Sequence, residues 1–225
     1  MNYLLNQRRL LQLLAGLILY GTTMALMIRA GLGLDPWDVF HQGLAEQLGL
    51  SFGTVVFLTG AIVLLAWIPL RQKPGIGTIL NIIVIAITVD VALALIPTPE
   101  ARDIEIKAVM MFAGILGNGF AAALYVGADL GAGPRDGLWV GIVERTGWSV
   151  RSVRTVIELT VMFTGIALGG LANMGTVFYA LLIGPVSQYW LPRVKVPDEV
   201  HRPEFSALQR ALPVPSRPVR AAPPT

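Results

Sequence analysis

Long apolar stretches, separated by short polar segments, run along most of this chain. A helix needs about 20 mostly apolar residues to cross a lipid bilayer. Six stretches approach that length, and they are Leu10–Ile28, Gly53–Leu70, Ile76–Ile96, Lys107–Val126, Ser152–Gly170 and Met174–Trp190. The pattern therefore predicts an all-α membrane protein with six transmembrane helices.

The composition indicates lipid rather than water as the main solvent. Hydrophobic residues make up 54% of the 225 positions and charged residues 14%, against about 25% charged residues in soluble domains. The chain has no cysteine, and its histidines are His41 and His201, which argues against thiolate chemistry and a multi-histidine metal centre. Common hydrolase and nucleotide-binding signatures are missing. We expect no enzyme activity, metal, cofactor or nucleic-acid partner; the expected partner is the bilayer.

Basic residues predict the orientation of the spans. If residues 1–9 are cytoplasmic, only Arg29, Arg102 and Lys107 of the 17 basic residues lie outside, as the positive-inside rule requires. Residues 97–106 then form an external loop. The segment 192–225 is rich in proline and arginine and is predicted to be a disordered cytoplasmic tail. That tail could contact lipid headgroups or a protein partner.

The chain aligns with itself, without a gap, when it is shifted by 98 positions. "AGLILYGTTMALMIRAGLGLDPWDVFHQGLAEQLGLS" from Ala15 then lies over "AGILGNGFAAALYVGADLGAGPRDGLWVGIVERTGWS" from Ala113. Identical pairs include Gly33 with Gly131, Pro36 with Pro134 and Asp38 with Asp136. Each copy, 10–96 and 107–191, holds three spans, so the second copy enters the membrane from the opposite side. The expected architecture is two inverted three-helix repeats, which are common in transporters.

The segments "GLGLDPWDVFHQGLAEQLGLSFGTV" and "GAGPRDGLWVGIVERTG" resemble the signature of the YczE/YyaS/YitT group of bacterial integral membrane proteins. The resemblance covers roughly Leu10 to Trp190 and excludes the tail. It implies a multi-pass protein of the bacterial plasma (inner) membrane, with both termini cytoplasmic if the charge pattern holds. It implies no settled activity and supplies no catalytic residues.

The repeated motif has the residues of a helix start. In the first copy Gly33 precedes Asp35, a good N-cap, and Pro36 and Asp38 suit the first turn. The pattern predicts a short helix from Pro36 to Leu48, too short to span. The second copy repeats the arrangement with Gly131, Gly133, Pro134 and Asp136. Each short helix, between the first and second spans of its repeat, could lie flat at the membrane interface or dip in as a re-entrant helix; its amphipathic stripe favours the flat position.

Polar residues inside the predicted spans are candidates for a functional site, because charges there are costly. Asp90 could bind a proton or cation, or could accept hydrogen bonds from a helix end or Arg29. Glu158 follows Arg154 by four positions, which predicts a structural pair or a proton site. Asn118 and Gln188 complete the candidate set. Since Gly133 replaces Asp35 in the second copy, a functional acid is sought at Asp90 or Glu158 rather than in the motif.

Two functions from different classes follow from these patterns. The first is a secondary transporter or channel-like permease for a small solute or a proton, with its pathway between the repeats. The second is a membrane scaffold or regulator without transport activity, acting through its tail. A polar cavity lined by Asp90, Asn118 and Glu158 would favour transport, whereas a sealed interior would favour the scaffold.

Overall fold

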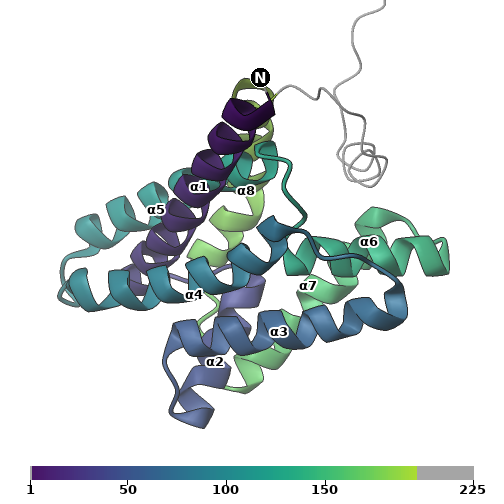
Figure 1. The fold of residues 1–225 in the computed structure, drawn as a ribbon. Coiled ribbons are helices and arrows are strands. Elements are labelled where there is room, and N and C mark those ends of the chain that lie inside the picture. The colour runs from purple at the N-terminus through teal and green to yellow at the C-terminus, as the bar shows by residue number, and fades with distance from the viewer. Residues whose placement is uncertain (1, 197–225) are drawn as a thin grey trace, which may run out of the picture.

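The computed structural model describes residues 2–196, which form eight α-helices and no β-strand (Figure 1). The helices are α1 (Asn2–Ala30), α2 (Pro36–Leu48), α3 (Phe52–Leu70), α4 (Ile76–Leu95), α5 (Ile104–Gly127), α6 (Pro134–Thr146), α7 (Val150–Ala167) and α8 (Met174–Val194). The predicted all-α class is confirmed for this part of the chain. The predicted tail begins at position 192, but α8 continues to Val194 and the amide of Val196 donates to the carbonyl oxygen of Gly127 at 3.0 Å. The rest of that tail, from position 197 onward, lies outside the described residues.

Four helices are long and apolar enough to cross a membrane: Gln7–Ala30 of α1, and α3, α4 and α5. Helices α7 and α8 coincide with the other two predicted spans but are less apolar. Three charged residues, Arg151, Arg154 and Glu158, interrupt α7, and Gln188 lowers the hydropathy of α8. Length and composition therefore support four of the six predicted spans.

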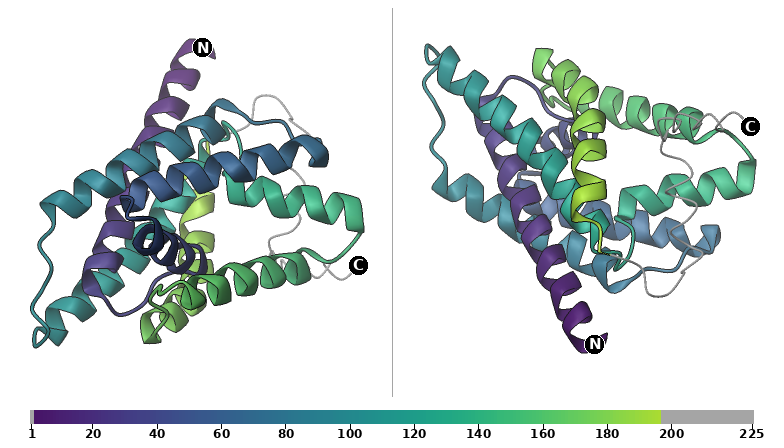
Figure 2. Two further views of the ribbon diagram at one scale, coloured as in Figure 1. Left: turned by 90° about the horizontal axis from the view of Figure 1, so that it is seen from below. Right: turned by 90° about the horizontal axis from the view of Figure 1, so that it is seen from above.

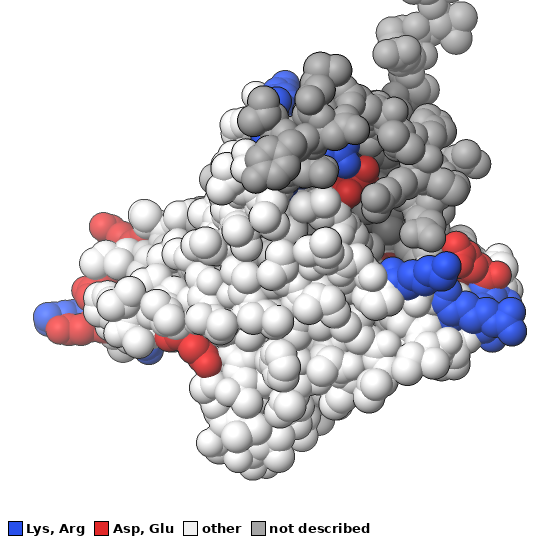
Figure 3. All heavy atoms as spheres, in the orientation of Figure 1, with Lys and Arg blue, Asp and Glu red and all other residues white. Residues whose placement is uncertain are grey.

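The surface of the helices is largely apolar. Exposed large residues include Ile62, Leu65, Ile68, Phe163 and Leu181, each more than 60% exposed. Such contiguous apolar surface is rare on soluble monomers. Figure 3 shows a broad uncharged area on one face, with the charged side chains gathered towards its edges. This surface is typical of a protein that faces lipid.

Helices α1 and α5 pack along each other at the centre, with α4 against α1 and α8 against α5 (Figure 2). One core cluster joins Leu17 and Met24 of α1 to Val89 of α4. A second joins Met27 to Ile115 of α5 and Tyr179 of α8. These four helices form the main packed core of the described residues.

Positions 98 apart have equivalent backbone conformations. Gly31 and Asp129, just after α1 and α5, both adopt the left-handed region, with φ of 63° and 54°. Gly49 and Gly147 end the short helices α2 and α6 in the same region, with φ of 64° and 70°. This conformation favours glycine, so Gly49 and Gly147 explain why the two short helices end at equivalent positions.

The two halves also exchange equivalent hydrogen bonds. The amide of Gly77, in the first turn of α4, donates to the carbonyl oxygen of Leu130 at 2.8 Å. The amide of Gly175, in the first turn of α8, donates to the carbonyl oxygen of Leu32 at 2.7 Å. The α5–α6 connection therefore binds the start of α4, and the α1–α2 connection binds the start of α8.

The halves differ at one contact. Helix α3 packs along α4, whereas α7 makes almost no contact with α8. A Cβ atom added at Gly60 of α3 would lie 3.0 Å from Cγ1 of Ile82 in α4. By contrast, a Cβ atom added at Gly184 of α8 would meet nothing within 4 Å, although its equivalent in α4, Ala86, is buried. We call the boundary between each of these helix pairs a seam. The α3–α4 seam is closed, because the two helices are in contact, and the α7–α8 seam is open, because those two helices make almost no contact.

The far ends of α3 and α7 are held by the short helices. A Cβ atom at Gly165, near the end of α7, would lie 2.5 Å from the backbone nitrogen of Phe40 in α2. Near the end of α3, Trp67 donates its indole N–H to the carbonyl oxygen of Pro134 in α6 at 3.0 Å. Helix α7 is thus fixed at its C-terminal end, and the seam opens towards its N-terminal end.

Candidate functional site

A cavity of about 740 Å³ lies between the two halves, and all eight helices contribute to its wall. Its wall is fully buried at one end, where Asp35 is 3% and Asn118 is 0% exposed. At the other end Arg151 and Gln188 are exposed. These two residues belong to the N-terminal part of α7 and the C-terminal part of α8, so the cavity follows the open α7–α8 seam into the interior.

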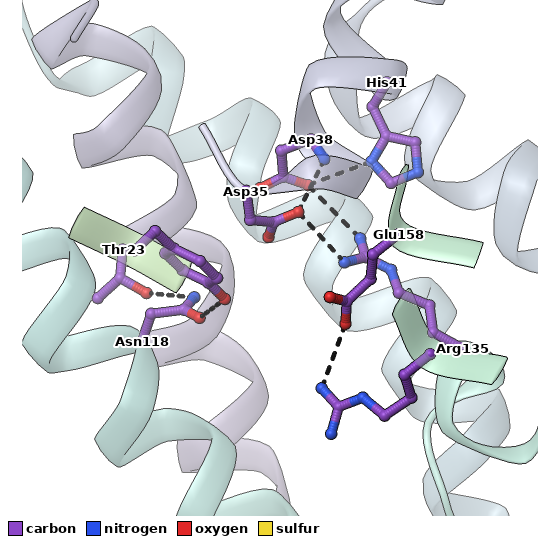
Figure 4. A network of polar contacts seen from close by, with 9 residues as sticks. Thr23, Asp35, Asp38, His41, Asn118, Arg135 and Glu158 are labelled. Atoms are coloured by element: carbon purple, nitrogen blue, oxygen red, sulfur yellow. Dashed lines mark hydrogen bonds and ion pairs between the residues drawn. The ribbon is translucent and has the colours of Figure 1, made fainter. Parts of the chain in front are cut away.

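A buried ion-pair network joins the two short helices at the buried end of the cavity (Figure 4). The guanidinium of Arg135, from α6, lies 3.8 Å from Oδ1 of Asp35 and 3.5 Å from Oδ1 of Asp38. It also lies over the ring of Trp37, 5.2 Å from its centroid. Nδ1 of His41 lies 3.2 Å from the same Asp38 oxygen. Residues from the two copies of the motif therefore meet in the interior.

The local sequence of α2 places the two aspartates. Pro36 occupies the first helical position, and Oδ1 of Asp35 accepts a hydrogen bond from the amide of Asp38 at 2.9 Å. This N-cap uses one oxygen of Asp35. Gly33 just before it has a φ of 117°, and a Cβ there would lie 2.8 Å from the amide nitrogen of Thr176. Glycine is needed because the chain turns inward against another backbone.

The start of α6 differs in its cap. Gly133 offers no side-chain hydrogen bond, and Pro134 again occupies the first turn. Asp136 accepts a hydrogen bond from the hydroxyl of Tyr125 at 2.8 Å. Gly131, with a φ of 131°, packs against the start of α4. Both motif copies thus start helices in the interior, but only the second supplies an arginine.

Burial dominates the acid–base behaviour of the network. It raises the pKa of Asp35 to about 6, with a further rise from the charge of Asp38 and an opposing effect of Arg135. Burial also raises the pKa of Asp38. The pKa of His41 is lowered by burial and then by Arg135, so this imidazole is neutral at pH 7. One guanidinium therefore faces two carboxyl groups.

Two carboxylate oxygens of this network, Oδ2 of Asp35 and Oδ2 of Asp38, are buried and have no hydrogen-bond partner among the described residues. Leaving a buried acceptor unsatisfied costs about 1–3 kcal/mol. Asp35 lines the cavity, and its free oxygen points away from Asp38 (Figure 4). An unsatisfied acceptor therefore lies in the cavity wall, just beneath its surface, and a small rotation of the Asp35 carboxyl group would expose it to a ligand.

Asp90 lies outside the cavity, at the contact between α3 and α4. Its Oδ2 accepts a hydrogen bond from the hydroxyl of Ser51 at 2.6 Å, and its Oδ1 accepts one from the amide of Gly53 at 2.7 Å. It therefore joins α4 to the first turn of α3, which is the helix-end alternative stated for it, and it does not line the cavity.

The other four candidate residues share the cavity wall. The amide of Asn118 donates to the hydroxyl of Thr23 at 3.1 Å and accepts from the hydroxyl of Tyr179 at 3.0 Å. Arg154 donates to Glu158 at 3.3 Å. Gln188 is exposed near the open seam. The structure thus places Asn118, Arg154, Glu158 and Gln188 around one cavity, at different depths, and places Asp90 outside it.

Sequence reasoning missed Arg135 and His41. It treated Asp35 and Asp38 as caps, and the tertiary structure adds their pairing with Arg135, which is 100 and 97 positions away, respectively. One signal was present: Arg135 stands opposite Trp37 in the aligned repeat. A charged residue in one copy and an aromatic residue at the equivalent position of the other indicate that the two copies differ in their interactions there.

Comparisons with known proteins identify a family and two relatives. Residues 7–192 match a family described as a family of unknown function (DUF6198). The chain is 41% identical over 179 residues to an uncharacterized protein of Haemophilus influenzae, covering 80% of this chain and 81% of that protein. It is 35% identical over 182 residues to the uncharacterized membrane protein YczE of Bacillus subtilis, covering 80% and 83%. No solved structure matches.

The apolar helical surface and the membrane-protein relative support the same assignment. The sequence resemblance stated above is confirmed for the YczE-like group. The chain therefore belongs to the DUF6198 family of YczE-like membrane proteins.

Proposed function

We propose that the protein is a secondary transporter or channel-like permease for a small solute in the bacterial plasma membrane. The observation that carries this proposal is the cavity of about 740 Å³, which has buried charged residues at one end and an exposed seam at the other. A scaffold or regulator, the alternative function, would be expected to have a packed interior. Ligand cavities are typically about 300–1,000 Å³.

The proposed architecture has six spans in two inverted repeats. The equivalent hydrogen bonds of Gly77 and Gly175 support it, because inverted halves related by a two-fold axis exchange contacts reciprocally. In this arrangement α7 and α8 are the fifth and sixth spans. The charged residues Arg154 and Glu158 line the cavity, which is where charges inside a span are tolerated.

The short helices are proposed to be re-entrant. In the inverted arrangement α2 approaches from outside and α6 from inside, across a hydrocarbon core about 30 Å thick. Helices lying flat on opposite faces could not bring Asp38 within 3.5 Å of Arg135. This replaces the flat position that the amphipathic stripe favoured.

Labelling of introduced cysteines tests the orientation, and the chain has no cysteine of its own. With both termini cytoplasmic, Ala45→Cys and Ala172→Cys should react with a membrane-impermeant maleimide added outside intact cells. Thr146→Cys should react only after permeabilisation. Each variant is compared with the cysteine-free protein. The reverse pattern would contradict the proposed orientation.

Alternating access follows from the unequal seams. The closed α3–α4 seam and the open α7–α8 seam occupy equivalent positions, so exchanging their states would move the opening to the other side of the membrane. This is the rocking motion expected of inverted repeats.

Disulfide trapping tests this exchange. Gly60→Cys with Ile82→Cys should cross-link readily, because a Cβ atom at position 60 would lie 3.0 Å from Cγ1 of Ile82. The equivalent pair, Glu158→Cys with Ala180→Cys, should cross-link only slowly, as the second seam closes transiently. Each single-cysteine variant is the control. If the second pair never cross-links while the first does so completely, the two seams do not exchange their states. That result would favour the scaffold or regulator function over transport.

A further inference from the structure

The buried end of the cavity carries more negative than positive formal charge. Asp35 and Asp136 line it, and Asp38 lies directly behind. Arg135 is the single cation of this cluster, and the neighbouring His41 is neutral because burial lowers its pKa. At this end three carboxyl groups share one guanidinium, which favours a cation over an anion.

One carboxylate oxygen of Asp35 accepts a hydrogen bond, and the other accepts none from the described residues. Its Oδ1 accepts the amide of Asp38 and faces Arg135. Its Oδ2 is buried without a partner among residues 2–196. A donor brought by a ligand would satisfy this acceptor, and a charged donor would do so most strongly.

Five aromatic residues line the cavity: Tyr20, Trp37, Tyr125, Trp139 and Tyr179. Aromatic faces attract cations and cover apolar bodies. Two of the cavity's arginines already use such faces, since Arg135 lies over Trp37 and Arg154 over Trp139. Arg154 is also paired with Glu158, and Arg151 is exposed at the opposite end.

We propose that the cavity binds a protonated amine carried on an apolar or aromatic body, with the ammonium group donating to Oδ2 of Asp35. That this ligand is also transported rests on the proposed function, because binding alone does not imply transport. The unpartnered oxygen, the excess of carboxylates and the aromatic wall all select the same ligand class.

A proton competes with the amine for Asp35. The titratable and charged groups near this carboxyl are Asp38 and His41 of α2, Arg135 and Asp136 of α6, Tyr20 of α1, Tyr125 of α5, Arg154 and Glu158 of α7, and Tyr179 of α8. The pKa of Asp35 in this setting is about 6. Above that pH the carboxylate is ionised and binds the amine. Below it, protonation removes the charge, so binding weakens about tenfold per pH unit.

Calorimetric titration of the protein in lipid nanodiscs tests the proposal with three indole probes: tryptamine, a cation; tryptophol, its neutral analogue; and indole-3-acetate, an anion. Empty nanodiscs correct for partitioning into lipid. At pH 7.5 tryptamine should bind at least tenfold more tightly than either analogue. Undetectable tryptamine binding, equal binding of tryptophol or tighter binding of indole-3-acetate would overturn the proposal.

Asp35→Asn is the decisive variant, because asparagine is also a good N-cap and keeps the start of α2. It should weaken tryptamine binding at least tenfold. The control Glu105→Gln removes one exposed carboxylate and should bind like the parent protein. Unchanged binding by Asp35→Asn would contradict the assignment. If that variant does not fold, the parent protein decides: binding should fall from pH 7 to pH 5, and constant binding would be contrary to the proposal.

The two proposals fail separately. Exchange of the two seams without tryptamine binding would contradict only the ligand class. Tryptamine binding without seam exchange would contradict transport and leave the amine site in place.

Discussion

Replacing Arg135 with methionine is expected to cost about 3–5 kcal/mol of unfolding free energy, the largest effect of any single substitution that we anticipate. Removing one partner of a buried ion pair leaves an uncompensated buried charge, and losses of this size are typical. Here two carboxyl groups would lose their cation, and both Asp35 and Asp38 are almost fully buried. Methionine keeps most of the side-chain volume, so the effect isolates the charge.

The loss should depend on pH. Protonation of Asp35, whose pKa is already about 6 with Arg135 present, removes the buried charge. The difference between the parent protein and Arg135→Met should therefore be smaller at pH 5 than at pH 8. Reversible unfolding in mixed detergent micelles measures both values. Arg135→Lys, which retains the charge, should be less damaging, and Asp35→Asn added to Arg135→Met should recover part of the loss. A change below about 1 kcal/mol at pH 8 would show that the network does not support the fold.

The second large effect is expected for Asp90→Ala, with about 3 kcal/mol of destabilisation. The carboxylate accepts hydrogen bonds from the hydroxyl of Ser51 and the amide of Gly53. Hydrogen bonds to a charged group contribute about 1.5–3 kcal/mol each, and their effects are not fully additive. Without them the first turn of α3 loses its attachment to α4.

The same substitution should open the closed seam. We expect Gly60→Cys, introduced together with Asp90→Ala, to react faster with a maleimide than Gly60→Cys alone. Asp90→Asn is the matched control, because the amide keeps one acceptor oxygen and should retain part of the attachment. It also resembles the open seam, where Gln188 is the equivalent residue. Equal reactivity in all three proteins would mean that Asp90 does not hold the seam.

Local features of the fold were predictable because they depend on neighbouring residues. The short helix from Pro36 to Leu48 has the predicted bounds, since its N-cap and its glycine terminator lie within the same segment. The pair of Arg154 and Glu158 follows from their four-residue spacing on one helix. Asp90 was predicted as a candidate functional acid, with hydrogen bonds to a helix end or Arg29 as the alternative, and the sequence alone could not choose between them.

The site depends on contacts across about 100 positions. No local pattern indicates that Arg135 faces Asp35 and Asp38, because that approach depends on how deeply α2 and α6 enter the interior. The amphipathic stripe of α2 pointed to the membrane surface, yet Trp37 from that stripe lies against Arg135 in the interior. An apolar face shows only that a residue leaves water, and lipid and protein can both cover it.

The sequence by itself therefore determined the membrane class, the family and the 98-position repeat. It also determined the residues at which the short helices α2 and α6 begin and end. Hydropathy and helix caps can be recognised in short windows of the chain, and the repeat and the family can be recognised by comparing sequences, without knowledge of any tertiary contact. Only the tertiary structure decided that α3 closes on α4 while α7 stands apart from α8, and that Asp35 faces a cavity. Those features arise from packing between distant helices, where two equivalent segments can adopt different contacts with nearly the same local conformation.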